Sequence, residues 1–329
     1  MRHSAFLSGN VSRFFVIAGQ LLLISVSSWA QDYPSRNVTL VAPFPAGGGT
    51  DLFARTISQE LAKQFGKQII VENRTGASGN IGAEAVAKAA PDGYTLLYTA
   101  SPIALSQPIY KKLGFDPQRD LKAISMTISI PLVLVVHRSL PARDFKGLLA
   151  LAKSRPDALT YSSGGPGSSG HYSIELLKLK TGVGLHHVPY RGTAPAVTSL
   201  ISGETQVSFL VPPVVQAHLE SGKLRALGIS AKKRSPVLRG IPTLQELGVA
   251  DFEALQWQGF FAPIKTPDNV INYLYTSISR ALEAPGVKSR FASEGADIVG
   301  SSPTEFAIFF KKELTQWTEV ANRAGMKIN

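Results

Sequence analysis

Cysteine is absent from this chain of 329 residues. Its absence excludes disulfides, thiolate nucleophiles and the lipid attachment of an exported lipoprotein. Long hydrophobic runs are also scarce, because no segment after the first 30 residues is long and apolar enough to cross a bilayer. Only 17% of the residues are charged, although basic residues outnumber acidic ones and give a formal net charge of +11.

The basic residues are dispersed along the sequence and do not form a nucleic-acid patch. Their densest run, Lys232-Lys233-Arg234, is too short to follow a phosphate backbone. We therefore expect no nucleic-acid partner. The favoured interpretation is a solvated surface that attracts anions through its long-range field.

The first 30 residues are typical of a secretory signal peptide. Arg2 and Arg13 form a basic start, an apolar stretch covers residues 14–27, and Ser28-Trp29-Ala30 is a small-x-small cleavage site. A permanent membrane anchor is the alternative, but the apolar stretch is shorter than the ~20 residues that span a bilayer. We predict export and cleavage after Ala30, which removes two arginines and lowers the formal charge from +11 to +9.

Strand and helix patterns alternate from residue 33 to about residue 230, which indicates an α/β architecture with mainly parallel sheets. The mature length favours two domains. Residues 51–65 have the apolar spacing of an amphipathic helix that ends at Gly66, and the tail after Pro267 is almost entirely helical. The apolar stretch from Ile128 to His137 is a candidate strand for crossing between lobes. Thr243 and Glu246 have the spacing of a capping box, as do Ser302 and Glu305.

Two glycine-rich corners each connect a strand to a helix. The first corner, residues 44–51, follows the strand at residues 38–41 and contains Gly47-Gly48-Gly49-Thr50-Asp51. The second corner, residues 163–171, follows the strand at residues 159–162. Glycines let a ligand approach the backbone, and the unpaired amides at a helix N-terminus attract an anion. Two such corners indicate two lobes that grip one negatively charged ligand.

Two catalytic interpretations of the second corner fail on the sequence. Gly165, Gly167 and Gly170 match the dinucleotide fingerprint G-x-G-x-x-G, but residues 185–190 hold no carboxylate to bind the ribose. No serine in either corner has glycine at both the −2 and +2 positions, as a nucleophile elbow requires. No paired carboxylates, base beside a nucleophile, or phosphate-loop lysine can be assembled, so we expect no enzyme activity.

The histidines do not predict a metal site. His186 and His187 are neighbours on a strand and point to opposite faces, so at most one shares a site with His171. We expect neither a metal nor a cofactor. Asp51 lies in a first helical turn, where it caps the helix, orients the loop or binds a donor group of a ligand.

The neutral donors in and around the corners suit reversible binding of a carboxylate, because no bond needs to break. Helix capping is the alternative role of each one, but capping does not require three consecutive glycines. These donors are Thr50, Ser78, Thr99, Ser101, Ser163, Ser168, Ser169, Tyr190 and Thr193.

The chain resembles the periplasmic solute-binding proteins of tripartite tricarboxylate transporters, the Bug or TctC-like family. The resemblance covers the whole mature chain in the expected order, and its motifs are jointly specific although none suffices alone. The matching segments are residues 33–36 (YPSR), 41–51 (VAPFPAGGGTD), 71–80 (VENRTGASGN), 91–97 (PDGYTLL), 187–196 (HVPYRGTAPA), 222–227 (GKLRAL), 242–248 (PTLQELG) and 257–259 (WQG).

The resemblance implies an α/β protein with the type II periplasmic-binding-protein fold, in which two lobes close over a ligand cleft. Lobe 1 would comprise residues 31–133 and 256–329, and lobe 2 residues 134–255. The implied protein is a periplasmic monomer that binds a small carboxylate, such as a di- or tricarboxylate or an aromatic acid, and delivers it to the membrane permease subunits of the transporter.

Carried over from the family, the ligand-binding residues come from both lobes. Lobe 1 would supply Phe44, Ala46, Gly47, Gly48, Thr50, Asp51, Thr99, Ala100 and Ser101. Lobe 2 would supply Ser163, Gly164, Gly167, Ser168, Ser169, His171, Tyr190, Arg191 and Thr193.

One position departs from the family pattern. Many members have an acidic residue where this chain has Ser208, and serine cannot pair with a ligand ammonium. We therefore expect a plain carboxylic acid to be preferred over an amino acid. Two alternatives remain open: an exported hydrolase that uses Ser168 or Ser169 with His171, and a sensory partner that presents the ligand-bound form to a receptor.

Overall fold

The computed structural model describes residues 33–326 except 107, 111–112, 236–237 and 239. The predicted signal peptide lies outside the described residues. A compact unit begins at Arg36 and contains every helix and strand named below. No helix of the described part combines the length and apolarity needed to cross a membrane.

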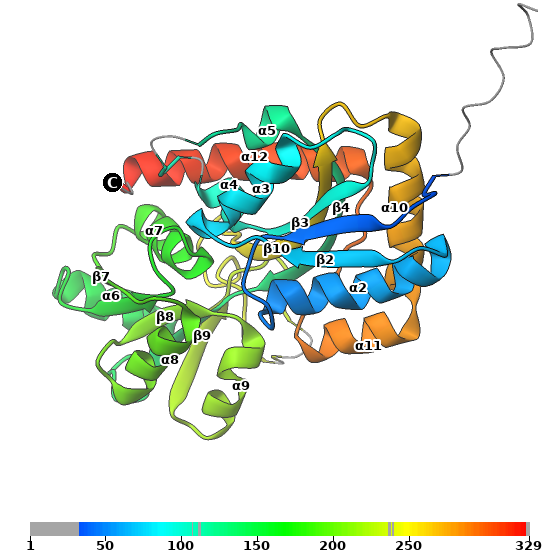
Figure 1. The fold of residues 1–329 in the computed structure, drawn as a ribbon. Helices are drawn as coiled ribbons and strands as arrows, with labels where there is room; N and C mark the ends of the chain where they lie inside the picture. Colours follow the sequence, from blue (N-terminus) through cyan, green and yellow to red (C-terminus); the bar gives the residue numbers. More distant parts are fainter. Residues whose placement is uncertain (1–32, 107, 111–112, 236–237, 239, 327–329) are drawn as a thin grey trace, which may run out of the picture. The chain divides into compact units, whose positions relative to one another are not determined.

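The first sheet has six strands among the described residues, in the order β11-β4-β10-β3-β1-β2 (Figure 1). Strand β1, next to the β2 edge, pairs in parallel with β2 and β3, whereas β10 runs antiparallel to β3 and β4. The bounds are β1 Val38–Ala42, β2 Ile69–Asn73, β3 Thr95–Ala100, β4 Leu121–Pro131, β10 Leu255–Pro263 and β11 Asp297–Ile298.

The helices around the first sheet come from both ends of the sequence. They are α2 Gly49–Phe65, η1 Ala77–Gly79, α3 Asn80–Ala87, α4 Pro102–Ser106, α5 Pro117–Asp120, α10 Asp268–Glu283, α11 Pro285–Ser293 and α12 Pro303–Arg323.

The second sheet has five strands among the described residues, in the order β7-β6-β8-β5-β9. Strand β6 pairs in parallel with β7 and β8, and β5 runs antiparallel to β8 and β9. The strands are β5 Val133–His137, β6 Thr160–Ser163, β7 His186–Pro189, β8 Val207–Leu210 and β9 Leu224–Ile229. The accompanying helices are α6 Phe145–Ser154, α7 Ser169–Thr181, α8 Thr193–Ser202 and α9 Pro212–Glu220.

The chain passes between the two sheets at Leu132. The stretch predicted as one strand over 128–137 is two strands, because β4 ends at Pro131 and β5 begins at Val133 in the other sheet. Proline cannot donate a ladder hydrogen bond, so it suits the end of a strand. The Leu132 amide donates to Ser230 Oγ at 2.8 Å, and the Ala254 amide donates to the carbonyl of Ser230 at 3.0 Å. Ser230 therefore ties the outward passage to the return passage.

The sequence signals for the end of the helix over residues 51–65 and for the start of the C-terminal helix are confirmed, whereas the capping-box spacing at Thr243 does not start a helix. Helix α2 ends at Phe65 with Gly66 in the left-handed region at φ 60°, and Ser302 and Glu305 form a complete capping box at the start of α12. Thr243 and Glu246 also exchange both capping hydrogen bonds, at 2.7 and 3.1 Å. Only turns follow them, because Gly248 adopts φ 93° and ends the segment before a helix can extend.

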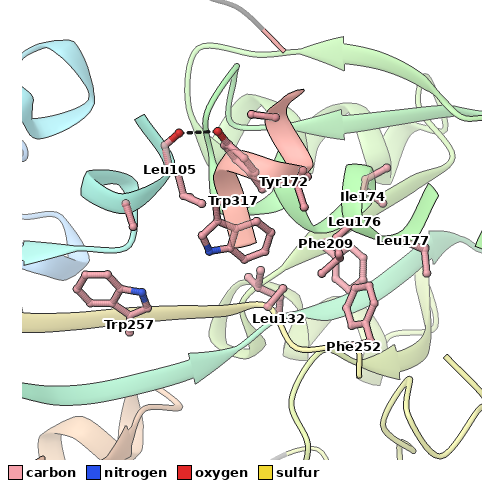
Figure 2. Close-up of a cluster of buried hydrophobic side chains, with 14 of the residues drawn as sticks. Leu105, Leu132, Tyr172, Ile174, Leu176, Leu177, Phe209, Phe252, Trp257 and Trp317 are labelled. Atoms are coloured by element: carbon pink, nitrogen blue, oxygen red, sulfur yellow. Dashed lines mark hydrogen bonds between the residues drawn. The ribbon is translucent and has the colours of Figure 1, made fainter. Parts of the chain in front are cut away.

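Helix α12 packs against α7, so one hydrophobic cluster contains residues from both sheet layers (Figure 2). The rings of Tyr172 and Trp317 meet edge to face with centroids 5.3 Å apart, and the Tyr172 hydroxyl donates to the carbonyl of Leu105 at 2.5 Å. The indoles of Trp257 and Trp317 both donate to Oε2 of the buried Glu313, at 2.8 and 3.0 Å. These contacts join α4, α7, α12 and β10 in one place.

Candidate ligand-binding site

The first corner is held in shape by Asp51. Its carboxylate, 3% exposed, accepts hydrogen bonds from the Gly47 amide at 2.9 Å, from Arg55 Nε at 2.9 and 3.0 Å, and from Asn73 Nδ2 at 2.9 Å. Burial opposes ionisation of Asp51, but the hydrogen bonds from Arg55, Gly47 and Asn73 outweigh it and lower its pKa. The same Asn73 nitrogen donates to the carbonyl of Phe44 at 3.0 Å. Asp51 therefore closes the loop onto the start of its own helix.

The start of α2 presents unpaired backbone donors. Gly48 is the N-cap residue and supplies no side-chain cap, and the Leu52 amide is the first to bond backward, to the carbonyl of Gly48. Among the described residues, the amides of Gly49, Thr50 and Asp51 have no acceptor. Three free N–H groups at the positive end of a helix dipole form a site for an anion.

The second corner repeats this geometry at the start of α7. Gly165 and Gly167 have φ angles of 114° and 80°, which only glycine adopts without strain. Ser168 is the N-cap, and its hydroxyl accepts from the His171 amide at 3.4 Å. Within the described part, the amides of Ser169 and Gly170 have no acceptor. A Cβ atom at Gly170 would lie 2.9 Å from the carbonyl oxygen of Phe209, so glycine lets α7 pack against β8.

Two stacked histidines support the second corner. The rings of His171 and His187 lie 4.0 Å apart with an interplanar angle of 12°, and His187 also stacks on Tyr161 at 4.7 Å. His187 Nε2 lies 2.7 Å from Ser163 Oγ, and the Gly167 amide donates to His171 Nδ1 at 3.3 Å. Burial lowers the pKa of His171 to about 3 and that of His187 to about 4. Both rings are therefore neutral at neutral pH, so His171 Nδ1 can be unprotonated and accept the hydrogen bond from the Gly167 amide.

His186 is exposed on the opposite face of β7 from His187, as predicted for neighbours on a strand. In the described part of the chain, no cluster of histidine, aspartate or glutamate is arranged to hold a metal ion.

The start of α8 lies beside the second corner. The Gly192 amide donates to the carbonyl of Gly164 at 3.2 Å, and the Tyr190 amide to that of Ser163 at 3.0 Å. The Tyr190 hydroxyl is buried and has no hydrogen-bond partner among the described residues. Arg191 and Thr193 are exposed. A buried phenol without a partner is a candidate donor to a ligand.

Residues that follow β3 meet the second corner directly. Ser101 Oγ lies 3.1 Å from Ser169 Oγ, and the Ser101 amide donates to the carbonyl of Trp257 at 3.0 Å. A Cβ atom at Gly167 would come within 2.8 Å of Ile109 Cδ1. Ser101 and its neighbours Thr99 and Ala100 therefore lie where the two sheet layers meet.

The described contacts do not bring all predicted residues together. No hydrogen bond between described residues joins the first corner to the second. Phe44 of the first corner instead packs against η1 beside the same sheet, where a Cβ atom at Gly79 would lie 3.1 Å from Phe44 Cζ. Ala46 is exposed at the turn that leads into Gly47.

A hydrolytic pair of Ser168 or Ser169 with His171 is not assembled. The Ser168 hydroxyl caps α7, and the Ser169 hydroxyl faces Ser101. In the second corner it is Ser163 whose hydroxyl contacts an imidazole: it is 1% exposed and bonds to His187.

Sequence reasoning did not select Arg55, Asn73 or His187, which hold the two corners in shape. The four-residue spacing of Asp51 and Arg55 on one helix face was an available signal for the role of Arg55 as the ion-pair partner of Asp51. Asn73 and His187 reach the corners through strand pairing, and no local pattern indicates that.

Comparisons with known proteins show which family the chain belongs to. Residues 53–326 match the family model described as the tripartite tricarboxylate transporter family receptor. Protein BugT of Bordetella pertussis is 35% identical over 324 residues, which cover 97% of this chain and 99% of that protein.

Two solved structures are also similar. R. palustris Rpa4515 with adipate is 35% identical with a TM-score of 0.78, over 90% of this chain and 99% of that one. MatC from Rhodopseudomonas palustris with bound malate is 32% identical with a TM-score of 0.74, over 88% and 99% of the two chains. The fold is the type II-like, two-lobed fold that was predicted, and the chain belongs to the TctC (Bug) family of periplasmic solute-binding receptors.

Proposed function

We propose that this chain is an exported periplasmic receptor that binds a small carboxylate by lobe closure and delivers it to the membrane permease subunits of a tripartite tricarboxylate transporter. The ligand is a di- or tricarboxylate or an aromatic acid, and it is released unchanged. The observation that carries the proposal is the pair of glycine corners whose helix N-termini keep unpaired amides. The adipate and malate in two similar structures support the ligand class.

In this proposal the chain is a monomer whose signal peptide is cleaved near Ala30. Lobe 1 comprises residues 31–133 and 256–329, and lobe 2 residues 134–255. The two passages beside Ser230 act as the hinge, because the chain crosses from sheet to sheet there. Closure is stabilised by the ligand, since only the closed form offers contacts from both lobes.

The amides of the two corners hold one carboxylate, with Thr50, Ser101 and Ser169 as neutral donors around it. Asp51 acts by positioning, because its oxygens are occupied by Gly47, Arg55 and Asn73. Neutral His171 and His187 keep the second corner in shape without adding charge.

A plain acid is preferred over an amino acid in this site. Ser208 is fully buried and its hydroxyl donates to the carbonyl of Ser162 at 2.8 Å, so it offers no charge to a ligand ammonium. Titration calorimetry checks this preference. Tight binding of glutamate or aspartate, without binding of dicarboxylates or aromatic acids, would contradict it.

The Gly49→Ala variant tests the proposal at the first corner. Apart from its chain neighbours and the backbone of its own helix, no described heavy atom lies within 4 Å of a Cβ atom at Gly49. Its φ is not in the left-handed region, so the fold tolerates the methyl group. The methyl group narrows the approach to the α2 amides, so we expect at least a tenfold loss of affinity for dicarboxylates in titration calorimetry, with unchanged thermal stability.

The matched control is Gly286→Ala. Gly286 lies in the first turn of α11, and beyond its own helix backbone and chain neighbours a Cβ atom there also meets no described heavy atom within 4 Å. We expect this variant to bind like the unaltered protein. Equal affinities of the two variants would contradict the proposed site. Failure of protein that has been unfolded, dialysed and refolded to bind any carboxylate would contradict the proposed function.

A further inference from the structure

Gln258 is a buried amide whose oxygen lacks a partner. The residue lies in β10 and is 1% exposed, and its Oε1 has no hydrogen-bond partner among the described residues. Leaving a buried acceptor unsatisfied destabilises the folded state, because the group loses its hydrogen bonds to water. A native structure that keeps such an atom requires an explanation, and a role in accepting a hydrogen bond from a ligand is one.

The position of Gln258 connects it to the candidate site. In the antiparallel pair of β10 and β3, Gln258 lies directly opposite Ala100, and the Ser101 amide bonds to the carbonyl of the preceding Trp257. Directly opposite residues place their side chains on the same face of a sheet. The amide of Gln258 therefore leaves the sheet beside Ala100, at the end of β3, next to the residues that meet the second corner.

The neighbouring residues on β10 face the other way. The indole of Trp257 bonds to Glu313 of α12, and a Cβ atom at Gly259 would lie 2.6 Å from Phe306 of the same helix. Because side chains alternate along a strand, Gln258 faces away from α12. Its own carbonyl and the Tyr98 hydroxyl both bond to Thr127 Oγ1, at 3.1 and 3.0 Å. These bonds occupy the carbonyl of Gln258 and the hydroxyls of Thr127 and Tyr98, and neither involves the side-chain oxygen of Gln258.

The available oxygen of Gln258 accepts hydrogen bonds, so it favours a ligand that carries a hydrogen-bond donor such as an ammonium or a hydroxyl group. An ammonium group would be buried there without a countercharge, because Asp51 is paired with Arg55 and Ser208 is neutral. A hydroxyl group needs no countercharge. We infer that Gln258 Oε1 accepts a hydrogen bond from a ligand hydroxyl, so that this receptor selects hydroxycarboxylates over the same carbon skeletons without the hydroxyl. The inference rests on the proposed function.

Two pairs of acids, each differing by one hydroxyl, test the inference at two chain lengths. They are malate with succinate, and 2-hydroxyadipate with adipate, titrated calorimetrically into the refolded protein. A site that hydrogen-bonds a substrate hydroxyl strongly rejects the analogue that lacks it. We expect the hydroxy acid of at least one pair to bind at least tenfold more tightly. We expect Gln258→Leu to bind both acids of that pair within about threefold of each other.

Two further variants provide a fallback and a control for this test. Gln258→Met fills the same space with a flexible chain and repeats the test if the leucine variant unfolds. Gln64→Leu is the matched control, because Gln64 Oε1 is also buried without a partner among the described residues but lies in the last turn of α2. We expect Gln64→Leu to keep the hydroxyl preference.

The outcomes separate this inference from the proposed function. Carboxylate binding without any hydroxyl preference, or a preference that survives in both Gln258 variants, overturns the inference alone. A protein that binds no carboxylate overturns both. Because removal of an unpaired buried acceptor does not destabilise the fold, the melting temperature of Gln258→Leu is expected to match or exceed that of the unaltered chain.

Discussion

Replacement of Glu313 by glutamine is expected to change how the stability of this protein depends on pH. Glu313 is 8% exposed, and its Oε2 accepts the indole N–H groups of Trp257 and Trp317. Burial raises its pKa from the ordinary 4.5 to about 6, against the opposing effect of the two indole hydrogen bonds. The amide oxygen of glutamine also accepts two hydrogen bonds, but glutamine cannot ionise.

The size and sign of the effect follow from linkage. A pKa that is higher in the folded protein means that the folded state binds the proton more tightly than the unfolded chain. The contribution of Glu313 is therefore fully present below pH 4.5 and is lost as pH rises through about 6. A rise from 4.5 to about 6 corresponds to ~2 kcal/mol, because one pKa unit is worth about 1.4 kcal/mol.

Urea unfolding followed by circular dichroism, at several pH values between 4.5 and 8, measures this contribution. The free energy of unfolding of Glu313→Gln minus that of the unaltered protein should increase by ~2 kcal/mol across the range. The difference cancels every other titrating group. A difference that stays constant within about 0.5 kcal/mol, or one that decreases with pH, would refute the reasoning.

Two further substitutions test the corners. Asp51→Asn removes the negative charge that accepts hydrogen bonds from Arg55 and the Gly47 amide, so we expect the free energy of unfolding in urea at pH 7 to fall by about 1.5–3 kcal/mol. This difference should shrink as pH falls through the lowered pKa of Asp51. An unchanged free energy of unfolding would contradict the positioning role of Asp51. His171→Asn keeps an acceptor near the Gly167 amide but cannot be protonated. Because burial lowers the pKa of His171 to about 3, the unaltered protein should lose stability as pH falls below 6.5, and the variant should lose less; parallel pH profiles would contradict this.

Local signals predicted much of the architecture. Glycines marked both corners, the apolar spacing of residues 51–65 located α2, and Ser302 marked the start of α12. These features depend on interactions within a few residues of the chain. The passage between sheets was placed in the correct stretch, but the sequence pattern did not show that Pro131 divides it into two strands.

The candidate site was predicted less completely, because its supports come from distant segments. Asn73 reaches Asp51 only through the pairing of β1 with β2, and His187 reaches Ser163 only through the pairing of β6 with β7. Gln258 reaches the end of β3 after the chain has completed the second sheet. A single sequence gives no register for such pairs, so residues of this kind become visible only in three dimensions.

The arrangement around Glu313 gives the protein an optical reporter of its own. The sequence has three tryptophans, of which Trp29 belongs to the predicted signal peptide, and Trp257 and Trp317 share one carboxylate oxygen. In the proposed mature chain, which lacks Trp29, all indole emission therefore originates from one buried place, where Trp317 also touches Tyr172 of α7 (Figure 2). Movement of α7 against α12 would change the surroundings of that indole, so the proposed lobe closure can be tested by fluorescence without attaching a dye.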